Sequence, residues 1–565
     1  MSGPVKVDVL VVGSGAAGLS AAVTAAMHGA SVMVAEKASV LGGTSAWSGG
    51  WLWIPRNPLA RAEGIDEAAD APLTYLQHEM GGEAADIRLQ TFLRYGPEMV
   101  EFFHQRTAVQ FLSGSAMPDF HPSPGAANGG RSVTAHPYDG RLLGDWLHRL
   151  RPPLETISLG GMGIAGGADM AHFFNATRSP RSALYAARRL LRHGWQRLRA
   201  GRGQHLVNGN ALVARLLRSA LDAGVRFQLN APVVRLLQGP PGVSGAVLRS
   251  DSGEIHVEAG AVVLACGGFP HDRQRLAQVV PHAAEGYGHF SAAPPDNQGE
   301  GIRLGESVGG QFDTSLRHPL AWAPVSRVTL ASGQQLMFPH LVERAKPGVI
   351  AVLPNGKRFV NEADSYHDFI AALLAATPAG DTPQGWLLAD RRTLRRYGLG
   401  HARPFPFTPT AWLRTGYLQR GNTLAELAKQ CAIDANALAE TVERFNHFAS
   451  AGEDVDFHRG ASAYNRAQGD HQVTLGPLRE GPFYAVRILP GSLGTFSGLQ
   501  TDEHARVLDE QQQPIPGLYA IGNDMSSVMR GYYPSGGITL GPAMTFGYLV
   551  GKNLAKKTNI NNNIT

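Results

Sequence analysis

The chain has 565 residues, of which 43% are hydrophobic and 17% charged, a composition typical of globular proteins with two or three domains. Its 51 Lys and Arg and 46 Asp and Glu leave a formal net charge of only +5, so we expect no nucleic acid partner. Its two cysteines exclude a disulfide framework and a cysteine metal site, and we expect no bound metal and a reducing, cytoplasmic compartment.

The first predicted elements form a strand–helix–strand unit around a glycine-rich turn. In "VDVLVVGSGAAGLSAAVTAAMHGASVMVAEK" (7–37) an apolar strand leads into G-x-G-x-x-G, an Ala-rich helix follows, and a second strand ends on Glu36. The glycines permit a tight turn, close approach of the backbone to a pyrophosphate, and close packing of helix on strand. The helix N-terminus faces the phosphates, and an acid at the position of Glu36 binds a ribose hydroxyl. The unit predicts a dinucleotide site made of Gly13, Ser14, Gly15, Ala16, Ala17, Gly18, Glu36 and Lys37.

A second glycine-rich segment, "KASVLGGTSAWSGG" (37–50), follows the ribose acid directly. It resembles the second FAD contact of the flavoprotein superfamily of fumarate reductases, succinate dehydrogenases and 3-ketosteroid dehydrogenases. The resemblance implies FAD as cofactor. Gly43 stands where succinate dehydrogenases carry the histidine that bonds covalently to the flavin, so we expect non-covalent FAD. The resemblance adds to the cofactor site Gly43, Thr44, Ser45, Ser48, Gly49 and Gly50.

A mostly helical insertion is expected over about 60–205. Within it, the Arg-rich stretch 178–204 is amphipathic, which indicates either a solvated helical face or a helix lying on a membrane surface or a partner. Peripheral membrane association therefore stays open, whereas no apolar run reaches the ~20 residues that span a bilayer, and we expect no integral membrane segment. The loop "PDFHPSPGA" (118–126) occupies the region where 3-ketosteroid dehydrogenases carry a tyrosine that assists the catalytic base, with Phe120 or His121 at that position.

Later apolar segments complete the predicted fold, which is of the α/β class. The resemblance implies that 210–275 adds strands to a Rossmann-type FAD domain, with the main chain near Val234 meeting the adenine and Gly267 close to the cofactor. "GLYAIGN" (517–523) is expected to return the chain to the flavin at Asn523. We therefore predict a discontinuous FAD domain, 1–275 and 485–556, with an inserted α+β catalytic domain at 276–484 and a disordered tail at 557–565.

The segment "YYPSGGITLGPAMTFG" (532–547) places two tyrosines before a helix start. In flavoproteins of this superfamily that helix points at the flavin pyrimidine, which implies contacts from Thr539 and Leu540. Fumarate reductases carry an arginine where this chain has Tyr532 and Tyr533. A phenol suits an uncharged ketone better than a carboxylate. The segment resembles the end of 3-ketosteroid Δ1-dehydrogenases, in which a tyrosine hydroxyl and a glycine N–H, matched here by Tyr533 and Gly537, bind the substrate carbonyl.

A third tyrosine completes the expected site. "GKRFVNEADSYHDF" (356–369) matches the family segment that carries the catalytic base, which assigns that role to Tyr366. A phenol has an ordinary pKa of about 10 and needs help to act as a base. The predicted catalytic set is Tyr366, Tyr533 and Gly537, and the predicted substrate-binding set is Phe338, Phe120, His121 and Tyr532.

The sequence thus predicts an FAD-dependent dehydrogenase that introduces a C=C bond beside the ketone of a cyclic substrate. We expect a 3-ketosteroid as substrate and an external electron acceptor. Three alternatives stay open: a dehydrogenase of small cyclohexanone-type rings, a fumarate-reductase-like enzyme that uses Arg530 on an unsaturated acid, and a flavin-binding carrier without redox turnover.

Overall fold

The computed structural model describes residues 4–562, with side chains to Ala555. Within them, an eight-stranded sheet has the order β19-β20-β11-β1-β2-β8, with β10 and β9 attached to β11 as a hairpin. The pairs β1–β11, β1–β2, β2–β8 and β11–β20 are parallel, which confirms the predicted Rossmann-type α/β fold. The strands are β1 (Val5–Val12), β2 (Val32–Ala35), β8 (Arg226–Gln228), β9 (Val233–Gly239), β10 (Gly242–Ser250), β11 (Gly253–Leu264), β19 (Arg506–Leu508) and β20 (Pro514–Ala520).

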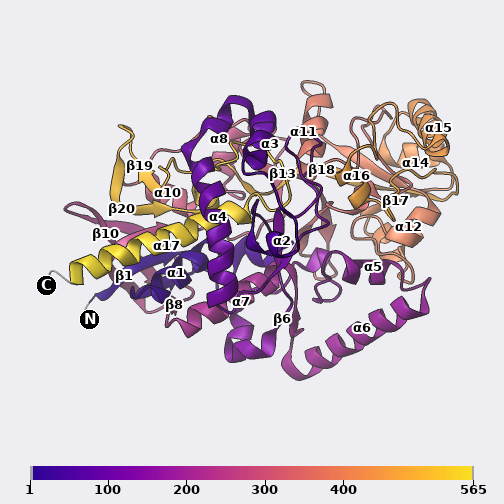
Figure 1. The fold of residues 1–565 in the computed structure, drawn as a ribbon. Helices are drawn as coiled ribbons and strands as arrows, with labels where there is room; N and C mark the ends of the chain where they lie inside the picture. Colours follow the sequence, from indigo (N-terminus) through magenta and orange to yellow (C-terminus); the bar gives the residue numbers. More distant parts are fainter. Residues whose placement is uncertain (1–3, 563–565) are drawn as a thin grey trace.

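The two ends of the chain meet on one face of this sheet. The C-terminal helix α17 (Leu540–Asn562) lies along α1 (Ala16–Met27), as Figure 1 shows. Contact is close because two residues of α17 lack a side chain there. A Cβ on Gly547 would lie 2.6 Å from Ala17 O, and one on Gly551 would lie 2.6 Å from Ala21 O. This packing carries the N-terminus of α17 to the glycine-rich turn before α1.

A second sheet, seven-stranded in the described chain, has the order β14-β13-β18-β16-β15, with β12 and β17 also paired to β18. Apart from the parallel β12–β18 contact, its pairs are antiparallel. Its strands are β12 (Phe290–Ser291), β13 (Leu320–Thr329), β14 (Gln335–Pro339), β15 (Val349–Val352), β16 (Gly385–Ala389), β17 (Leu418–Gly421) and β18 (Phe483–Thr495). The helices in this part are α8 (Arg273–Val279), α9 (Pro281–Ala284), α10 (Glu300–Glu306), α11 (Tyr366–Ala376), α12 (Arg391–Tyr397), α13 (Thr410–Arg414), α14 (Leu424–Cys431), α15 (Ala435–Ala451) and α16 (Ala463–Gln468).

The predicted boundary at 484/485 falls inside β18, whose 13 residues pair with β13 and β16 of the second sheet. A strand cannot be divided between two domains without breaking its pairing. We therefore propose that the catalytic domain extends to about residue 495 and that the FAD domain resumes after it.

The segment 60–205 contains more helix than strand. Its helices are α2 (Pro58–Ala62), α3 (Ala71–Met80), α4 (Ile87–Arg106), α5 (Ala168–Phe174) and α6 (Pro180–Ala200), followed by α7 (Asn208–Asp222). Short strands form a β3-β5-β4 sheet and a β6–β7 pair, namely β3 (Trp51–Trp53), β4 (Phe111–Ser113), β5 (Ser132–Ala135), β6 (Tyr138–Asp139) and β7 (His205–Leu206). Figure 1 shows α6 along the lower edge, set apart from the two sheets.

Two absences hold for the described part of the chain. None of its helices combines the length and the apolar character needed to cross a membrane, and no cluster of three or more His, Cys, Asp or Glu could hold a metal ion. The tail that we predicted to be disordered, 557–565, is helical backbone as far as Asn562, and 563–565 lie outside the described residues.

Candidate active site

The turn after β1 leaves room for a ligand at one of its three glycines. Gly13 has φ +108°, and a Cβ there would lie 2.3 Å from Ala265 O, while a Cβ on Gly18 would lie 2.1 Å from Gly13 O. At these two positions the protein's own backbone leaves no room for a side chain, so glycine is required there whether or not a ligand binds. A Cβ on Gly15, at the N-cap of α1, would meet only Ser45 Oγ at 3.4 Å. Close backbone approach at Gly15 is therefore available to a bound group.

The second glycine-rich segment folds against this turn. The N–H and hydroxyl of Ser14 donate to Glu36 Oε2 at 3.2 and 2.6 Å, and the Ala16 N–H donates to Ser45 Oγ at 3.0 Å. Ser45 lies in a short 3₁₀ helix, Gly43–Trp47, and the Ser48 hydroxyl donates to Ser45 O at 2.7 Å. The turn and the segment thus form one continuous, hydrogen-bonded surface, which we call the cradle. Its remaining predicted members are the small residues Gly49, Gly50 and Thr44 beside these contacts.

Two side chains that the sequence did not single out tie this cradle to the rest of the site. Asn297 Nδ2 donates to Thr44 Oγ1 at 2.9 Å and to Gly267 O at 3.2 Å. The carboxylate of Asp524, next to Asn523, accepts the N–H groups of Cys266 at 2.6 Å and Gly268 at 2.9 Å, and burial raises its pKa to about 6. Each residue makes a contact with a segment more than 200 residues away. No local sequence motif indicates such a contact, so the sequence did not single out either residue.

Two other predicted cofactor residues, Lys37 and Val234, lie outside these hydrogen-bonded contacts. Lys37 forms an ion pair with Glu300, Nζ to Oε1 2.5 Å, so its charge is already balanced. Val234 lies on β9, and the chain shortly before it passes beside Glu36, where the Ala231 N–H donates to Glu36 O at 3.0 Å. Val234 therefore follows a segment that reaches the predicted ribose end of the site.

The N-terminus of α17 supplies donors on the other side. Within residues 4–555, the backbone N–H groups of Gly537, Ile538 and Thr539 form no hydrogen bond, and α17 begins at Leu540. Such unpaired groups at a helix N-terminus favour a bound anion or a carbonyl oxygen. Gly537 has φ +103°, and a Cβ there would lie 2.6 Å from Trp53 N, so β3 fixes the backbone at this point.

Tyr366 meets Tyr533, which lies four positions before Gly537 in the chain. Tyr366 is the first residue of α11, whose N-cap Ser365 accepts the Asp368 N–H at 3.1 Å. Its hydroxyl donates to the Tyr533 hydroxyl at 2.7 Å, and the two rings pack edge to face with centroids 5.1 Å apart. Tyr533 is buried and Tyr366 half-buried. The structure thus brings together two predicted catalytic residues that are 167 positions apart.

Phe120, and not His121, packs on the phenol pair. Its ring stacks on Tyr533 with centroids 5.7 Å apart and meets Tyr366 edge-on at 5.7 Å. Tyr464, which the sequence analysis missed, lies against Phe120 at 4.4 Å. This phenol is also close enough to Tyr366 to raise its pKa. The segment 118–126 therefore contributes an apolar wall instead of an assisting hydroxyl.

His121 is held away from the pair by two carboxylates. Its Nδ1 lies 2.5 Å from Glu79 Oε2 and its Nε2 lies 2.7 Å from Asp368 Oδ2. Although desolvation opposes charging, these hydrogen bonds raise the pKa of His121 to about 10. His121 is therefore an imidazolium in an ion triad, which explains why it does not take the place of the family's tyrosine.

Three further residues from the sequence analysis do not meet the phenol pair. In the described chain, the ring contacts of Phe338 are with His340 at 5.0 Å and His401 at 6.2 Å. The ring of Tyr532 lies under the Arg317 guanidinium at 4.9 Å. Arg530 is engaged by Glu83 Oε2 at 2.8 Å and Asp313 Oδ2 at 2.5 Å. Its guanidinium is thus committed to two carboxylates and a serine hydroxyl.

Burial keeps both phenols protonated in the resting site. It raises the pKa of Tyr366 well above its ordinary value, with Tyr533 adding to the effect, and it raises the pKa of Tyr533 to about 12. The buried guanidinium of Arg344 opposes the shift at Tyr366. Arg344 is held by carbonyl oxygens, with Nη1 donating to Glu362 O at 2.8 Å and to Asp364 O at 3.2 Å. Like Tyr464, it is a residue that sequence reasoning missed.

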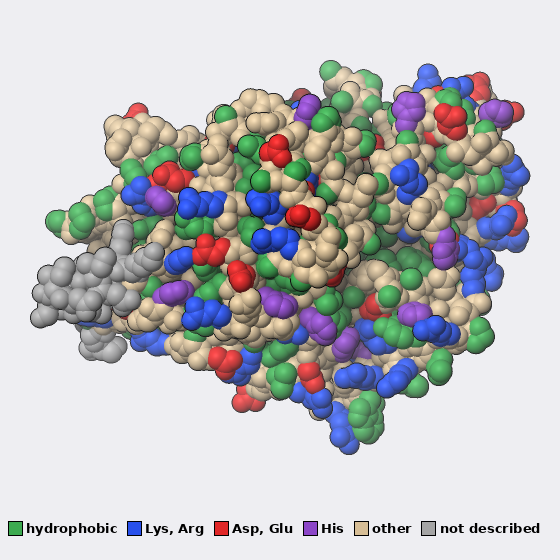
Figure 2. Space-filling view, viewed as in Figure 1, with side chains coloured by type: hydrophobic (Ala, Val, Ile, Leu, Met, Phe, Trp, Pro, Cys, Tyr) green, Lys and Arg blue, Asp and Glu red, His purple; other side chains and the backbone are tan. Residues whose placement is uncertain are grey.

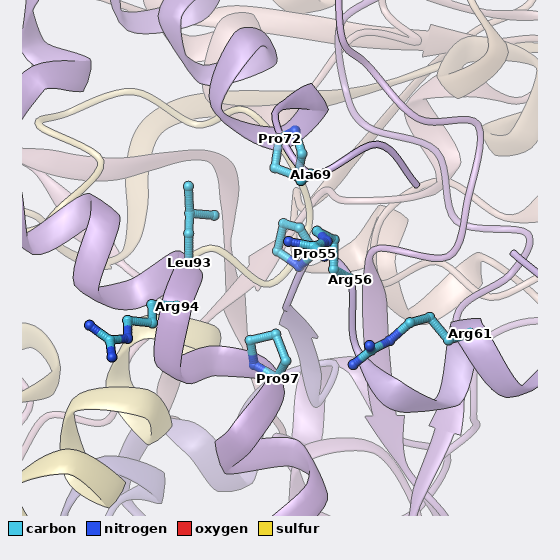
Figure 3. Close-up of a pocket in the computed structure, with 8 residues that line it drawn as sticks. All are labelled: Pro55, Arg56, Arg61, Ala69, Pro72, Leu93, Arg94 and Pro97. Carbon is cyan, nitrogen blue, oxygen red and sulfur yellow. The ribbon is translucent and has the colours of Figure 1, made fainter. Parts of the chain in front are cut away.

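A separate cavity of about 410 Å³ opens between α2, α3 and α4. Figure 3 shows its lining, which consists of Pro55, Arg56, Arg61, Ala69, Pro72, Leu93, Arg94 and Pro97. None of these is a predicted site residue, so this cavity is distinct from the phenol pair and its cradle.

Comparison with known proteins decides the family. The family model described as "FAD binding domain" matches residues 8–540. The chain belongs to this FAD-binding family. The room at Gly15, the Glu36 carboxylate and the unpaired N–H groups before α17 fit FAD, and the predicted cofactor is confirmed.

This flavoenzyme also has close relatives over its whole length. It is 40% identical over 556 residues to the 4-oxocyclohex-2-ene-1-carboxylate 5-dehydrogenase of Sinomonas cyclohexanicum, covering 97% of this chain and 94% of that protein. It is 35% identical to the 3-oxosteroid 1-dehydrogenase of Mycolicibacterium smegmatis, with 97% of both chains covered. Among solved structures, the 3-ketosteroid Δ1-dehydrogenase of Sterolibacterium denitrificans, in complex with 1,4-androstadiene-3,17-dione, matches with TM-score 0.88, 36% identity and coverage of 98% and 100%.

The predicted resemblance to 3-ketosteroid Δ1-dehydrogenases is confirmed by these matches. The chain is an FAD-dependent oxidoreductase that acts on CH–CH groups. The alternative of a flavin-binding carrier without redox turnover is therefore set aside.

Proposed function

We propose that this flavoenzyme dehydrogenates a ring ketone, forming a C=C bond between the α and β carbons beside the carbonyl. The observation that carries the proposal is the Tyr366–Tyr533 hydroxyl pair at 2.7 Å, on the chain segment that leads to Gly537. In the described chain no guanidinium donates to either phenol. Uncharged donors of this kind suit a neutral ketone and not a dicarboxylate.

In this proposal Tyr533 and Gly537 bind the carbonyl oxygen. The Tyr533 hydroxyl accepts from Tyr366, which leaves its own proton free to be donated. The unpaired Gly537 N–H supplies the second donor. The hydrogen bonds from both donors become stronger as the carbonyl oxygen gains negative charge in the enolate, as in an oxyanion hole.

Tyr366, once its own proton has left to solvent, takes the α proton as the general base. The residue is half-buried, and the positive charge of Arg344 stabilises its phenolate relative to the phenol. When bound, FAD supplies the acceptor for the hydride that leaves the β carbon. The substrate thus loses one proton to Tyr366 and one hydride, and the two electrons pass to an external acceptor.

The substrate that we favour is a single oxocyclohexane ring. The sequence alone led us to expect a 3-ketosteroid, but the relative at 40% identity is named for a one-ring oxo acid. Phe120 and Tyr464 also add two aromatic rings to the wall of the site. The 3-ketosteroid remains a second candidate, because the structural match with TM-score 0.88 is to a steroid dehydrogenase with its steroid bound. We propose that the enzyme acts in the cytoplasm, in line with its two free cysteines.

The test is anaerobic mixing of the FAD-loaded enzyme with 4-oxocyclohexanecarboxylate, cyclohexanone and 4-androstene-3,17-dione in turn. We expect the first two to bleach the flavin and to yield products lighter by two hydrogens. Bleaching by the steroid alone would transfer the proposal to the second candidate. If no ketone bleached the flavin while fumarate reoxidised the reduced enzyme, the dehydrogenase proposal would be wrong.

A further inference from the structure

Helix α6 (Pro180–Ala200) turns its apolar side away from the protein. The residues that it buries against the body are small or polar, namely Ser182, Ala186 and Gln196. Its large apolar side chains are exposed instead, with Leu184 at 73%, Leu191 at 75%, Trp195 at 57% and Leu198 at 85%. An amphipathic helix of a globular protein normally shows the opposite arrangement.

The exposed apolar residues form one stripe. Positions 184, 191, 195 and 198 are separated by seven, four and three residues, which places them on one helix face. Ala187 and Gly194, both exposed, lie between them on the same side. An exposed, contiguous patch of this kind marks a surface that is covered in the working protein.

The charged side chains of the α6 segment itself have a single sign. No Asp or Glu occurs in 178–204, which contains eight arginines. The exposed members of α6 are Arg181, Arg188, Arg192, Arg197 and Arg199. In the described chain none of these five forms an ion pair, whereas the inward-facing Arg189 pairs with Asp169 at 2.9 Å. Arg199 lies over the Trp195 ring at 4.3 Å.

A neighbouring loop continues the same surface. Phe405 and Phe407 are 47% and 51% exposed, and the Arg395 guanidinium lies over the Phe405 ring at 4.7 Å. Phe405 and Arg178, just before α6, line one hollow of about 730 Å³. Figure 2 shows hydrophobic and basic side chains gathered along the lower edge, over α6, and basic ones continuing up the right edge.

We propose that this α6 surface, made of the Leu184–Leu198 stripe, its five exposed arginines, Phe405 and Phe407, docks on an anionic phospholipid bilayer. Leucine and tryptophan side chains insert at the headgroup boundary, and arginines bind lipid phosphates. Charge complementarity favours a lipid bilayer over a second copy of the chain as the partner of this surface. A second copy docked face to face would bring two all-basic helices together without a carboxylate between them, whereas anionic headgroups neutralise them.

The test is sedimentation of the full FAD-loaded chain with vesicles of phosphatidylcholine alone and of phosphatidylcholine mixed with phosphatidylglycerol. We expect binding to the anionic vesicles that weakens with salt. The double substitution Leu191→Glu with Leu198→Glu should lower partitioning by roughly a hundredfold, about tenfold for each leucine that no longer inserts. Arg188→Gln with Arg192→Gln should lower it roughly fivefold per charge.

Ile87→Glu is the matched control, because Ile87 is 54% exposed at the start of α4 and outside the α6 surface. It should partition like the wild type, and flavin reduction by the substrate without vesicles should be unchanged in every variant. Equal binding to both kinds of vesicle, or to neither, would overturn the proposal. So would a dimer in sedimentation velocity that the leucine substitutions dissociate, because a second copy would then cover α6.

Discussion

Replacing Tyr533 by Phe isolates the contribution of one hydroxyl group. The ring should keep its place, because Phe120 stacks on it at 5.7 Å and His367 lies against it at 5.5 Å. In the free enzyme the change removes the hydrogen bonds of this hydroxyl with Tyr366 at 2.7 Å and with Thr539, each worth about 1 kcal/mol of stability. At the transition state it removes one of two donors to the developing enolate, which costs about 2.7–4 kcal/mol, or roughly 10²–10³ in rate.

The assay is the rate at which the ketone bleaches the bound flavin under anaerobic conditions, measured by stopped flow. Tyr533→Phe should keep its full flavin content and change KM little. Tyr532→Phe is the control at the neighbouring position, because that ring lies under Arg317 and away from the pair. We expect its rate to stay within about threefold of wild type. A Tyr533→Phe enzyme as fast as this control would show that the hydroxyl does not hold the enolate.

Four further results are expected at or beside the same site. Tyr366→Phe should slow flavin reduction by roughly 10²–10⁴, and wild-type kcat/KM should rise with pH into the alkaline range, because burial raises the pKa of the Tyr366 base; a flat pH profile would contradict this role. Gly537→Ala should slow the reaction and lower the melting temperature, because a Cβ would lie 2.6 Å from Trp53 N at φ +103°. His121→Gln should reduce the melting temperature more at pH 6 than at pH 10. The pKa of His121 in the folded protein, about 10, is raised above its ordinary ~6.5. The charged imidazole therefore stabilises the fold fully below pH ~6.5, and this stabilisation is lost as the pH rises through 10. Equal losses at both pH values would show that His121 does not carry the charge.

The nucleotide half of the protein could be predicted because its determinants are local. Gly13, Gly15, Gly18 and Glu36 lie within 24 residues, and their spacing alone defines the turn, the helix entrance and the ribose acid. The domain boundary was harder to predict. β18 is a long strand that serves one sheet and leads back to the other. Pro490, Gly491 and Gly494 lie inside this strand, so they do not mark the change of domain.

The phenol pair depended on resemblance, since no periodicity relates positions 366 and 533. Sequence reasoning could not choose between Phe120 and His121, because the choice depends on Glu79 and Asp368 from two other helices. These carboxylates capture the imidazole and turn the phenylalanine ring to the tyrosines. Tyr464 and Arg344 were missed for the same reason, since each acts on Tyr366 only through the tertiary fold.

The electrostatics of the resting site follow from these contacts. With both phenols protonated and hydrogen-bonded to each other, the site holds no phenolate that would repel an electron-rich carbonyl. Negative charge enters when Tyr366 loses its own proton to solvent, and it moves from the Tyr366 oxygen to the enolate oxygen as the substrate's α proton is transferred. The buried Arg344 lies near Tyr366, and the Gly537 N–H with the N-terminus of α17 is available to the enolate oxygen. In the proposed reaction a fixed positive charge or dipole thus stands at each end of the proton transfer and lowers the energy of the charged state without a mobile cation.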